Sequence, residues 1–160
     1  KLVDSGLLAG VCDLTTTELA DDLVGGVLSA GPDRLEIAGT KGVPQVVSLG
    51  ALDMVNFGPM DTVPAQFAGR NLFVHNPTVT LMRTTAEEMR ELGRRIAERL
   101  AGAVGPTELF IPLRGVSAID VDGTVHSQKA LGIAARIQDA VFESGDPALL
   151  RYRLGCSERV

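Results

Sequence analysis

Short apolar runs recur along the chain, and each ends in polar residues. Four of them have the length and composition of strands, and they are expected at Leu7–Leu14, Gln45–Leu49, Asn71–His75 and Glu108–Leu113. The run Gln45–Leu49 contains adjacent valines and no alternation, which is typical of a short strand covered on both faces. Pro112 in the last run favours an edge position or a strand that ends there.

The segments between these runs predict helices. Thr15 and Glu18 have the spacing of a capping box, which predicts a helix from about 16 to 24. A second helix is expected between Ser29 and Gly39. A further helix is expected from about Ser127 to Phe142.

The third helix has the clearest pattern. Thr84 and Glu87 form a second capping box before a helix expected from about 84 to 101. Its apolar residues recur at the helical period and form one stripe: Met89, Leu92, Ile96 and Leu100. The other face carries alternating arginines and glutamates, as expected of a solvated helix surface.

Strands that alternate with helices through short loops predict βαβ units and a parallel sheet. The expected fold is therefore α/β, with three layers: a mostly parallel open sheet and helices on both faces, as in Rossmann-like proteins. Residues 1–145 are expected to form this single domain. Residues 146–160 form a C-terminal tail with no predicted element.

In an open parallel sheet the strand-end loops meet at one edge, where ligands bind. The polar clusters expected at that edge are 13–18, 50–56, 75–78 and 114–120. The candidate ligand-binding residues within them are Asp53, Asn56, His75, Asn76, Arg114 and Ser117. The alternative for Asp53 and Asn56 is that each hydrogen-bonds its own turn.

Arg114 is the candidate for the strongest anion contact, since its planar fork suits carboxylate or phosphate. It could instead pair with Asp120 or Asp53 to hold the loops. The acidic residues Asp13, Glu18, Asp53 and Asp120 could hold Mg²⁺. Their spacing is not diagnostic, so no metal ligand is assigned.

Catalytic residues cannot be assigned from these patterns. His75 could act as an acid or base, although a histidine at a strand end is more often a hydrogen-bonded structural residue. Ser117 lacks the G-x-S-x-G motif and a histidine partner, so the sequence does not support nucleophilic catalysis.

The composition of the chain limits the classes of binding partner that are expected. The chain has 160 residues, 45% of them hydrophobic, which is enough for one domain with a real core. With 15 basic and 20 acidic residues the net charge is −5, and no basic stripe predicts nucleic-acid binding. No run has membrane-spanning length. The separated Cys12 and Cys156 fit a reducing cytoplasm.

Five segments resemble one family, the ATP-binding domains similar to the tomato mosaic virus resistance protein. They are LVDSGLLAGVCDLTTTELAD, GGVLSAGPDRLEIA, VPQVVSLGALDMVNFGP, HNPTVTLMRTT and PLRGVSAID. The resemblance extends from about Leu2 to Asp120 and implies that this chain is the second of two α/β subdomains. It also implies ATP binding, self-association and a preceding N-terminal subdomain that carries the glycine-rich segment.

Three functions remain open at this point. The leading one is a ligand-binding module that contributes strand-end loops to a site for a nucleotide or another small anion. The alternatives are an enzyme of hydrolase or lyase type, in which Arg114 orients a small anionic metabolite, and an assembly domain.

Overall fold

The computed structural model describes residues 2–112, 115–120 and 150–155, and the fold is described for these residues. The strands are β1 (Val11–Thr15), β2 (Gln45–Gly50), β3 (Met54–Phe57), β4 (Leu72–Asn76), β5 (Val79–Arg83), β6 (Thr107–Pro112) and β7 (Leu150–Gly155). The helices are α1 (Thr17–Val24), α2 (Glu36–Thr40) and α3 (Ala86–Ala101). Short 3₁₀ turns lie at Val3–Ser5, Met60–Thr62 and Ala65–Phe67.

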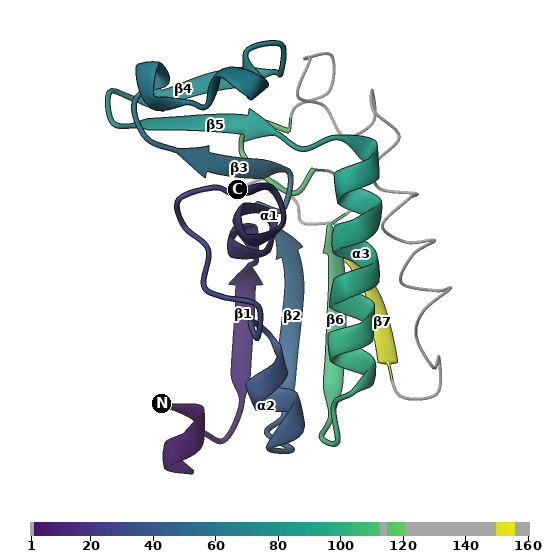
Figure 1. Cartoon of the computed structure of the whole chain (residues 1–160). Helices are drawn as coiled ribbons and strands as arrows, with labels where there is room; N and C mark the ends of the chain where they lie inside the picture. Colours follow the sequence, from purple (N-terminus) through teal and green to yellow (C-terminus); the bar gives the residue numbers. More distant parts are fainter. Residues whose placement is uncertain (1, 113–114, 121–149, 156–160) are drawn as a thin grey trace.

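A parallel sheet in the order β1-β2-β6-β7 forms the main layer. It confirms the α/β class and the Rossmann-like arrangement expected from the sequence. Strand β7 falls within residues 146–160, where no element was predicted, and pairs with β6 along its whole length. Figure 1 shows β1, β2 and β6 running in the same direction.

A second, antiparallel sheet has the order β3-β5-β4 and lies across the carboxyl ends of the parallel strands (Figure 1). The expectation that the strand near 71–75 joins the parallel sheet is therefore wrong. An Asn-Pro-Thr turn joins β4 directly to β5, and such a short connection can only return the chain antiparallel.

The described helices lie on one face of the parallel sheet. Both α1 and α2 contact α3, and Figure 1 shows the three in front of the strands. The helix predicted at 127–142 falls outside the described residues.

The core lies between this helix layer and the parallel sheet. It includes Val47 and Leu49 from β2 and Leu109 from β6, which are completely buried with the predicted stripe of α3. Along β2, however, burial alternates: Val46 and Ser48 are only partly buried. The face of β2 that carries Val46 and Ser48 is therefore less covered than the face that packs against the helices.

The helices α1 and α3 start close to where the sequence predicted, with differences in detail. The start predicted for the second helix at Ser29 is wrong: α2 begins at Glu36, and the Ser29 hydroxyl donates to Asp22 Oδ1. For α3 the capping box is formed by Thr85 and Glu88, one residue later than predicted. Arg70 fixes Glu88 through two further hydrogen bonds of 2.7 and 3.0 Å. The box predicted for α1 is absent, because its N-cap is Thr16, whose hydroxyl donates to the Ser48 carbonyl.

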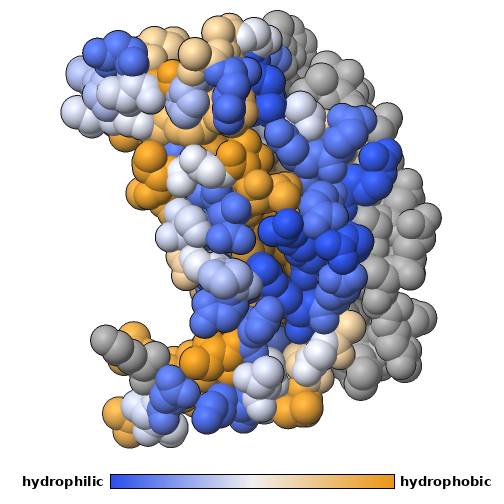
Figure 2. All heavy atoms as spheres, viewed as in Figure 1, coloured by the Kyte–Doolittle hydropathy of each residue, from blue (hydrophilic) through white to orange (hydrophobic). Residues whose placement is uncertain are grey.

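The outer face of α3 is hydrophilic, as predicted. Figure 2 shows hydrophilic residues gathered over this helix. Arg94 binds both Glu91 and Glu98 along the helix surface. No helix among the described residues is long and apolar enough to cross a membrane.

We expect Ile96→Ala to destabilise the domain by about 2–5 kcal/mol, since its side chain is completely buried against the sheet. Arg95→Ala, on the adjacent partly exposed face, should cost about 1 kcal/mol or less. Chemical denaturation of both variants measures the difference. Equal losses would show that the wrong face of α3 has been assigned to the core.

Candidate functional site

Two loops meet at the carboxyl edge of the parallel sheet, beneath the second sheet. One follows β2 and contains residues 51–53, and the other follows β6 and contains residues 115–120. The Ala51 amide donates to the Val116 carbonyl at 2.7 Å, which joins the loops directly. The Val116 amide in turn donates to Asp120 Oδ2 at 2.9 Å. The two strand ends are therefore held in one fixed arrangement.

The centre of this arrangement is Asp53, whose side chain is completely buried. Arg83, from the end of β5, lies with its Nη1 3.1 Å from Asp53 Oδ2 and donates to the Asp53 carbonyl at 3.0 Å. The Ser117 hydroxyl donates to the same Oδ2 at 2.7 Å. Three chain segments distant in sequence thus meet at a single carboxylate, and we call Asp53, Arg83 and Ser117 the strand-end cluster.

Burial dominates the electrostatics of the cluster. It raises the pKa of Asp53, against the hydrogen bond from Ser117 and the charge of Arg83, which lower it. Burial also lowers the pKa of Arg83, while Asp53 and Asp120 raise it. Asp53 is therefore a stronger base than a solvated aspartate.

The cluster has unused hydrogen-bonding capacity. Among the described residues, Arg83 Nε and Nη2 and Asp53 Oδ1 are buried atoms without a hydrogen-bond partner. Leaving a buried polar group unpaired costs about 1–3 kcal/mol. Ser117 is only partly buried, so the cluster combines a completely buried carboxylate with a serine at intermediate depth.

The backbone on both sides of the cluster adopts left-handed geometry. Gly115 has φ of +123°, and a Cβ there would lie 2.7 Å from the Asp120 carbonyl oxygen. Ala51 has φ of 55°, which is uncommon for a residue with a side chain. Such strain is found where the surrounding structure imposes a precise loop position.

Asn56, a predicted site residue, makes its hydrogen bonds outside the strand-end cluster. Its backbone amide and its side-chain amide donate to Asp21 Oδ1 at 2.8 and 3.1 Å, and the side chain also donates to Thr17 at 2.9 Å. The other oxygen of Asp21 accepts from the Leu28 amide at 2.7 Å. Asn56 therefore ties β3 to α1 and its following loop.

His75 and Asn76 lie away from the strand-end cluster. Both are exposed at the hairpin end of β4, where Asn76 Oδ1 accepts from the Thr78 amide and hydroxyl. Asn76 pairs with Val79 at one end of β5, whereas Arg83 is at the other end, about 13 Å away at the usual rise per residue. The structure therefore does not bring His75 to Asp53.

The remaining candidates are the acidic residues considered for Mg²⁺ and Arg114. Asp13 is paired with Arg34 at 2.7 Å, and Glu18 lies 3.9 Å from the same guanidinium. In the searched part of the chain, no three His, Cys, Asp or Glu side chains are grouped to hold a metal ion. Arg114 lies outside the described residues.

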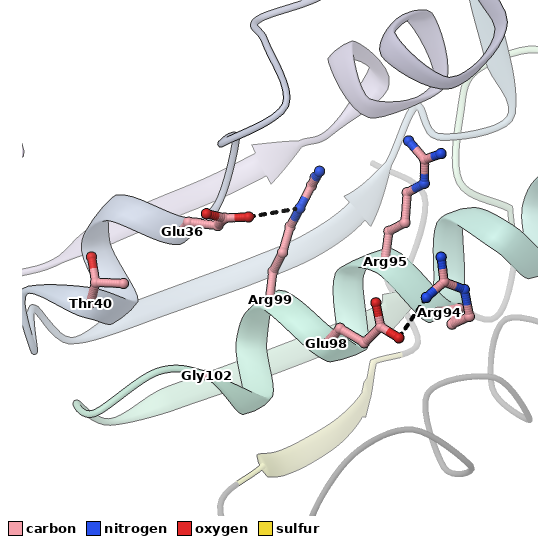
Figure 3. A pocket seen from close by; sticks show the side chains of 7 residues that line it. All are labelled: Glu36, Thr40, Arg94, Arg95, Glu98, Arg99 and Gly102. Carbon is pink, nitrogen blue, oxygen red and sulfur yellow. Dashed lines mark hydrogen bonds and ion pairs between the residues drawn. The ribbon is translucent and has the colours of Figure 1, made fainter.

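A concave region lies between α2 and α3, with a volume of about 530 Å³. In Figure 3 Glu36 and Arg99 meet across it, 3.5 Å apart, and Glu98 pairs with Arg94. Hydrogen bonds from Arg94 and Arg95 lower the pKa of Glu91, beside this hollow, to about 2. Its charges thus neutralise one another within the protein, which makes it a weaker anion site than its arginines suggest.

Sequence reasoning missed Arg83. The residue ends β5, shortly before the α3 cap, and no strand was predicted there. The available signal was an arginine directly after the apolar Leu81 and Met82, because a charge that is buried beside such residues needs a partner.

Comparison with known proteins supplies the family context. Residues 1–143 match the C-terminal domain of an uncharacterised protein family, UPF0261. The chain is 62% identical over 124 residues to a UPF0261 protein of Clostridium tetani and 54% identical over 123 residues to one of Mesorhizobium japonicum. It is 46% identical over 122 residues to the ToMV resistance protein Tm-1(GCR237) of Solanum lycopersicum.

These similarities cover most of this chain but a small part of each relative. They span 78% of the chain and 31% of the Clostridium protein, and 76% of the chain and 16% of the tomato protein. The chain therefore spans about a third of the length of these bacterial relatives.

We expect Gly115→Ala to displace the loop after β6, because the added Cβ would meet the Asp120 carbonyl. The loss should be about 1 kcal/mol or more in unfolding free energy. Gly69→Ala is the matched control, since a Cβ there has no atom within 4 Å. Denaturation curves that coincide for the two variants would contradict this account of the loop.

Proposed function

The chain belongs to the UPF0261 C-terminal domain family, and on that premise we propose that it is the ligand-binding second subdomain of an ATP-binding protein. Its contribution is a pair of strand-end loops that line a site for an anionic small molecule. The observation that carries the proposal is the strand-end cluster, which joins a buried arginine with unused donors to a partly exposed serine.

The position of the cluster supports this function. In open parallel sheets, ligands bind at the carboxyl ends of the strands. Here the loops after β2 and β6 are both held at that edge, and the end of β5 adds Arg83. These loops are thus fixed before a ligand arrives, which reduces the entropy cost of binding.

The unused donors of Arg83 favour an anion that enters between the loops. Asp53 occupies only Nη1 of Arg83, so Nε and Nη2 remain available as a donor pair. Two parallel N–H donors match a carboxylate or phosphate edge. Arg114, which follows β6 in the sequence, is the candidate for a second cation on the same anion.

ATP is the ligand that the family resemblance suggests, with Mg²⁺ as its usual ion. The proposal includes a cytoplasmic protein in which an N-terminal subdomain completes the site and copies of the chain self-associate. It includes neither a nucleic-acid partner nor a membrane partner, in keeping with the net charge of −5.

A second candidate is an enzyme that acts on a small anionic metabolite. The observation in its favour is the 2.7 Å contact between the Ser117 hydroxyl and the buried Asp53 carboxylate. Loss of a compound from a panel of small anions incubated with the full-length protein would favour this candidate. Binding of ATP without turnover would favour the first.

Calorimetric titration of the full-length protein with ATP, with and without Mg²⁺, tests the proposal. Ser117→Ala should weaken binding by about 0.5–1.5 kcal/mol and Arg114→Ala by about 1.5–3 kcal/mol. Arg114→Lys should recover only part of the loss, because lysine keeps the charge but not the fork. His75→Ala is the control and should bind normally, since His75 is exposed on the β4 hairpin.

Two results would refute the proposal. One is the absence of ATP binding by the wild-type protein. The other is unchanged affinity in both the Ser117 and Arg114 variants.

A further inference from the structure

Ser117 has a partner that its sequence did not reveal. The chain around it has no nucleophile motif, yet the structure places its Oγ 2.7 Å from Asp53 Oδ2, a distance at which a proton can pass between the two oxygens. The two residues are 64 positions apart. Their contact depends on the hydrogen bond that joins the loops after β2 and β6.

The acceptor of the Ser117 hydrogen bond is an unusual carboxylate. Asp53 is completely buried, and its Oδ1 has no hydrogen-bond partner among the described residues. A carboxylate in this position is poorly solvated, so it gains more from accepting a proton than a surface carboxylate does. Arg83, from β5, and Asp120, from the loop after β6, are the charged groups that act on it.

A second serine–aspartate pair in the same chain differs from Ser117 and Asp53 in its burial. Ser29 also donates to a carboxylate, Asp22 Oδ1, at 3.0 Å. That pair is exposed, and the Asp22 side chain retains 21% of its accessible surface. Ser29 and Asp22 thus have the same two chemical groups without the burial, which makes them a natural control.

We infer that Ser117 is a nucleophile activated by Asp53, in a site for the ester or thioester of a small acyl compound. This inference rests on the proposed ligand site and assigns its chemistry. An acyl carbonyl is uncharged at the reacting atom, so it can approach Ser117 close to the carboxylates of Asp53 and Asp120.

The reaction balances with water as the second substrate. Ser117 Oγ attacks the carbonyl carbon, and its proton passes to Asp53 Oδ2. As the bond to the leaving group breaks, the leaving group takes the electron pair and receives that proton. Water then attacks the acyl-serine, Asp53 accepts the water proton, and Ser117 Oγ recovers it when the carboxylic acid departs.

Arg83 has a positioning role in this scheme. Its Nη1 holds Asp53 Oδ2 and the Asp53 carbonyl, which fixes the carboxylate toward Ser117. Its charge also lowers the pKa of Asp53 against the effect of burial, which favours the ionised carboxylate that a general base requires.

The test is labelling of the full-length protein with a fluorophosphonate probe, which reacts with activated serines and needs no knowledge of the substrate. We expect one adduct, located at Ser117 by peptide mass spectrometry. Ser117→Ala should abolish it, and Ser29→Ala should leave it unchanged. Asp53→Asn should slow it by about 10²–10⁴-fold, the usual contribution of a general base.

The pH profile provides a second readout if Asp53→Asn does not fold. The wild-type labelling rate should rise through a single inflection above the ordinary aspartate range and then level off, because only ionised Asp53 accepts the proton. A rate that rises with hydroxide concentration without levelling off would overturn the inference. So would the absence of a Ser117 adduct, equal labelling of Ser29, or an unchanged rate in a folded Asp53→Asn protein.

The outcomes also separate this inference from the proposed function. If ATP binds in the titration but Ser117 is not labelled, the proposed ligand site is supported and the inference that Ser117 is a nucleophile is contradicted. Labelling at Ser117 in a protein that does not bind ATP would support Ser117 as a nucleophile and contradict the proposal that the site binds a nucleotide.

Discussion

The arrangement of this domain depends on one buried ion pair, between Asp53 and Arg83. Both side chains are almost completely removed from solvent, at 0% and 2% exposure. Burying two charges is costly unless they pair closely and make further hydrogen bonds. Asp53 meets that condition through Arg83 and Ser117, and Arg83 through the carboxylate and the carbonyl of Asp53. The pair therefore fixes the end of β5, the turn after β2 and the loop after β6 in one position.

The same pair explains how two sheets of different type form one unit. The parallel sheet places its strand ends at one edge, and the antiparallel sheet lies across them. Asp53 stands directly before β3, opposite Arg83 at the end of β5, so their contact closes the second sheet at that edge. The hairpin end of that sheet, with His75 and Asn76, remains exposed.

The elements with strong periodicity could be predicted from the sequence. The buried run of β2 and the apolar stripe of α3 were identified because their patterns are imposed by one sheet and one helix layer. The antiparallel sheet was not, since β3 and β5 are short and their apolar residues resemble loop or helix-start sequence. Asp53 and Ser117 were correctly brought to one edge by the parallel-sheet argument, whereas His75 was misplaced by the assumption that its strand was parallel. The role of Arg83 could not be predicted without knowing that β4 and β5 form a hairpin, because the hairpin places Arg83 beside Asp53.

A double-mutant cycle on the buried pair tests this account most directly. Asp53→Asn and Arg83→Met, singly and together, are compared with the wild type by chemical denaturation. Each single change should cost about 3–5 kcal/mol, because it leaves a buried group without its partner. The double variant should lose clearly less than the sum, since neither group then remains unpaired. Losses that simply add would contradict the claim that this ion pair holds the two sheets and the site together.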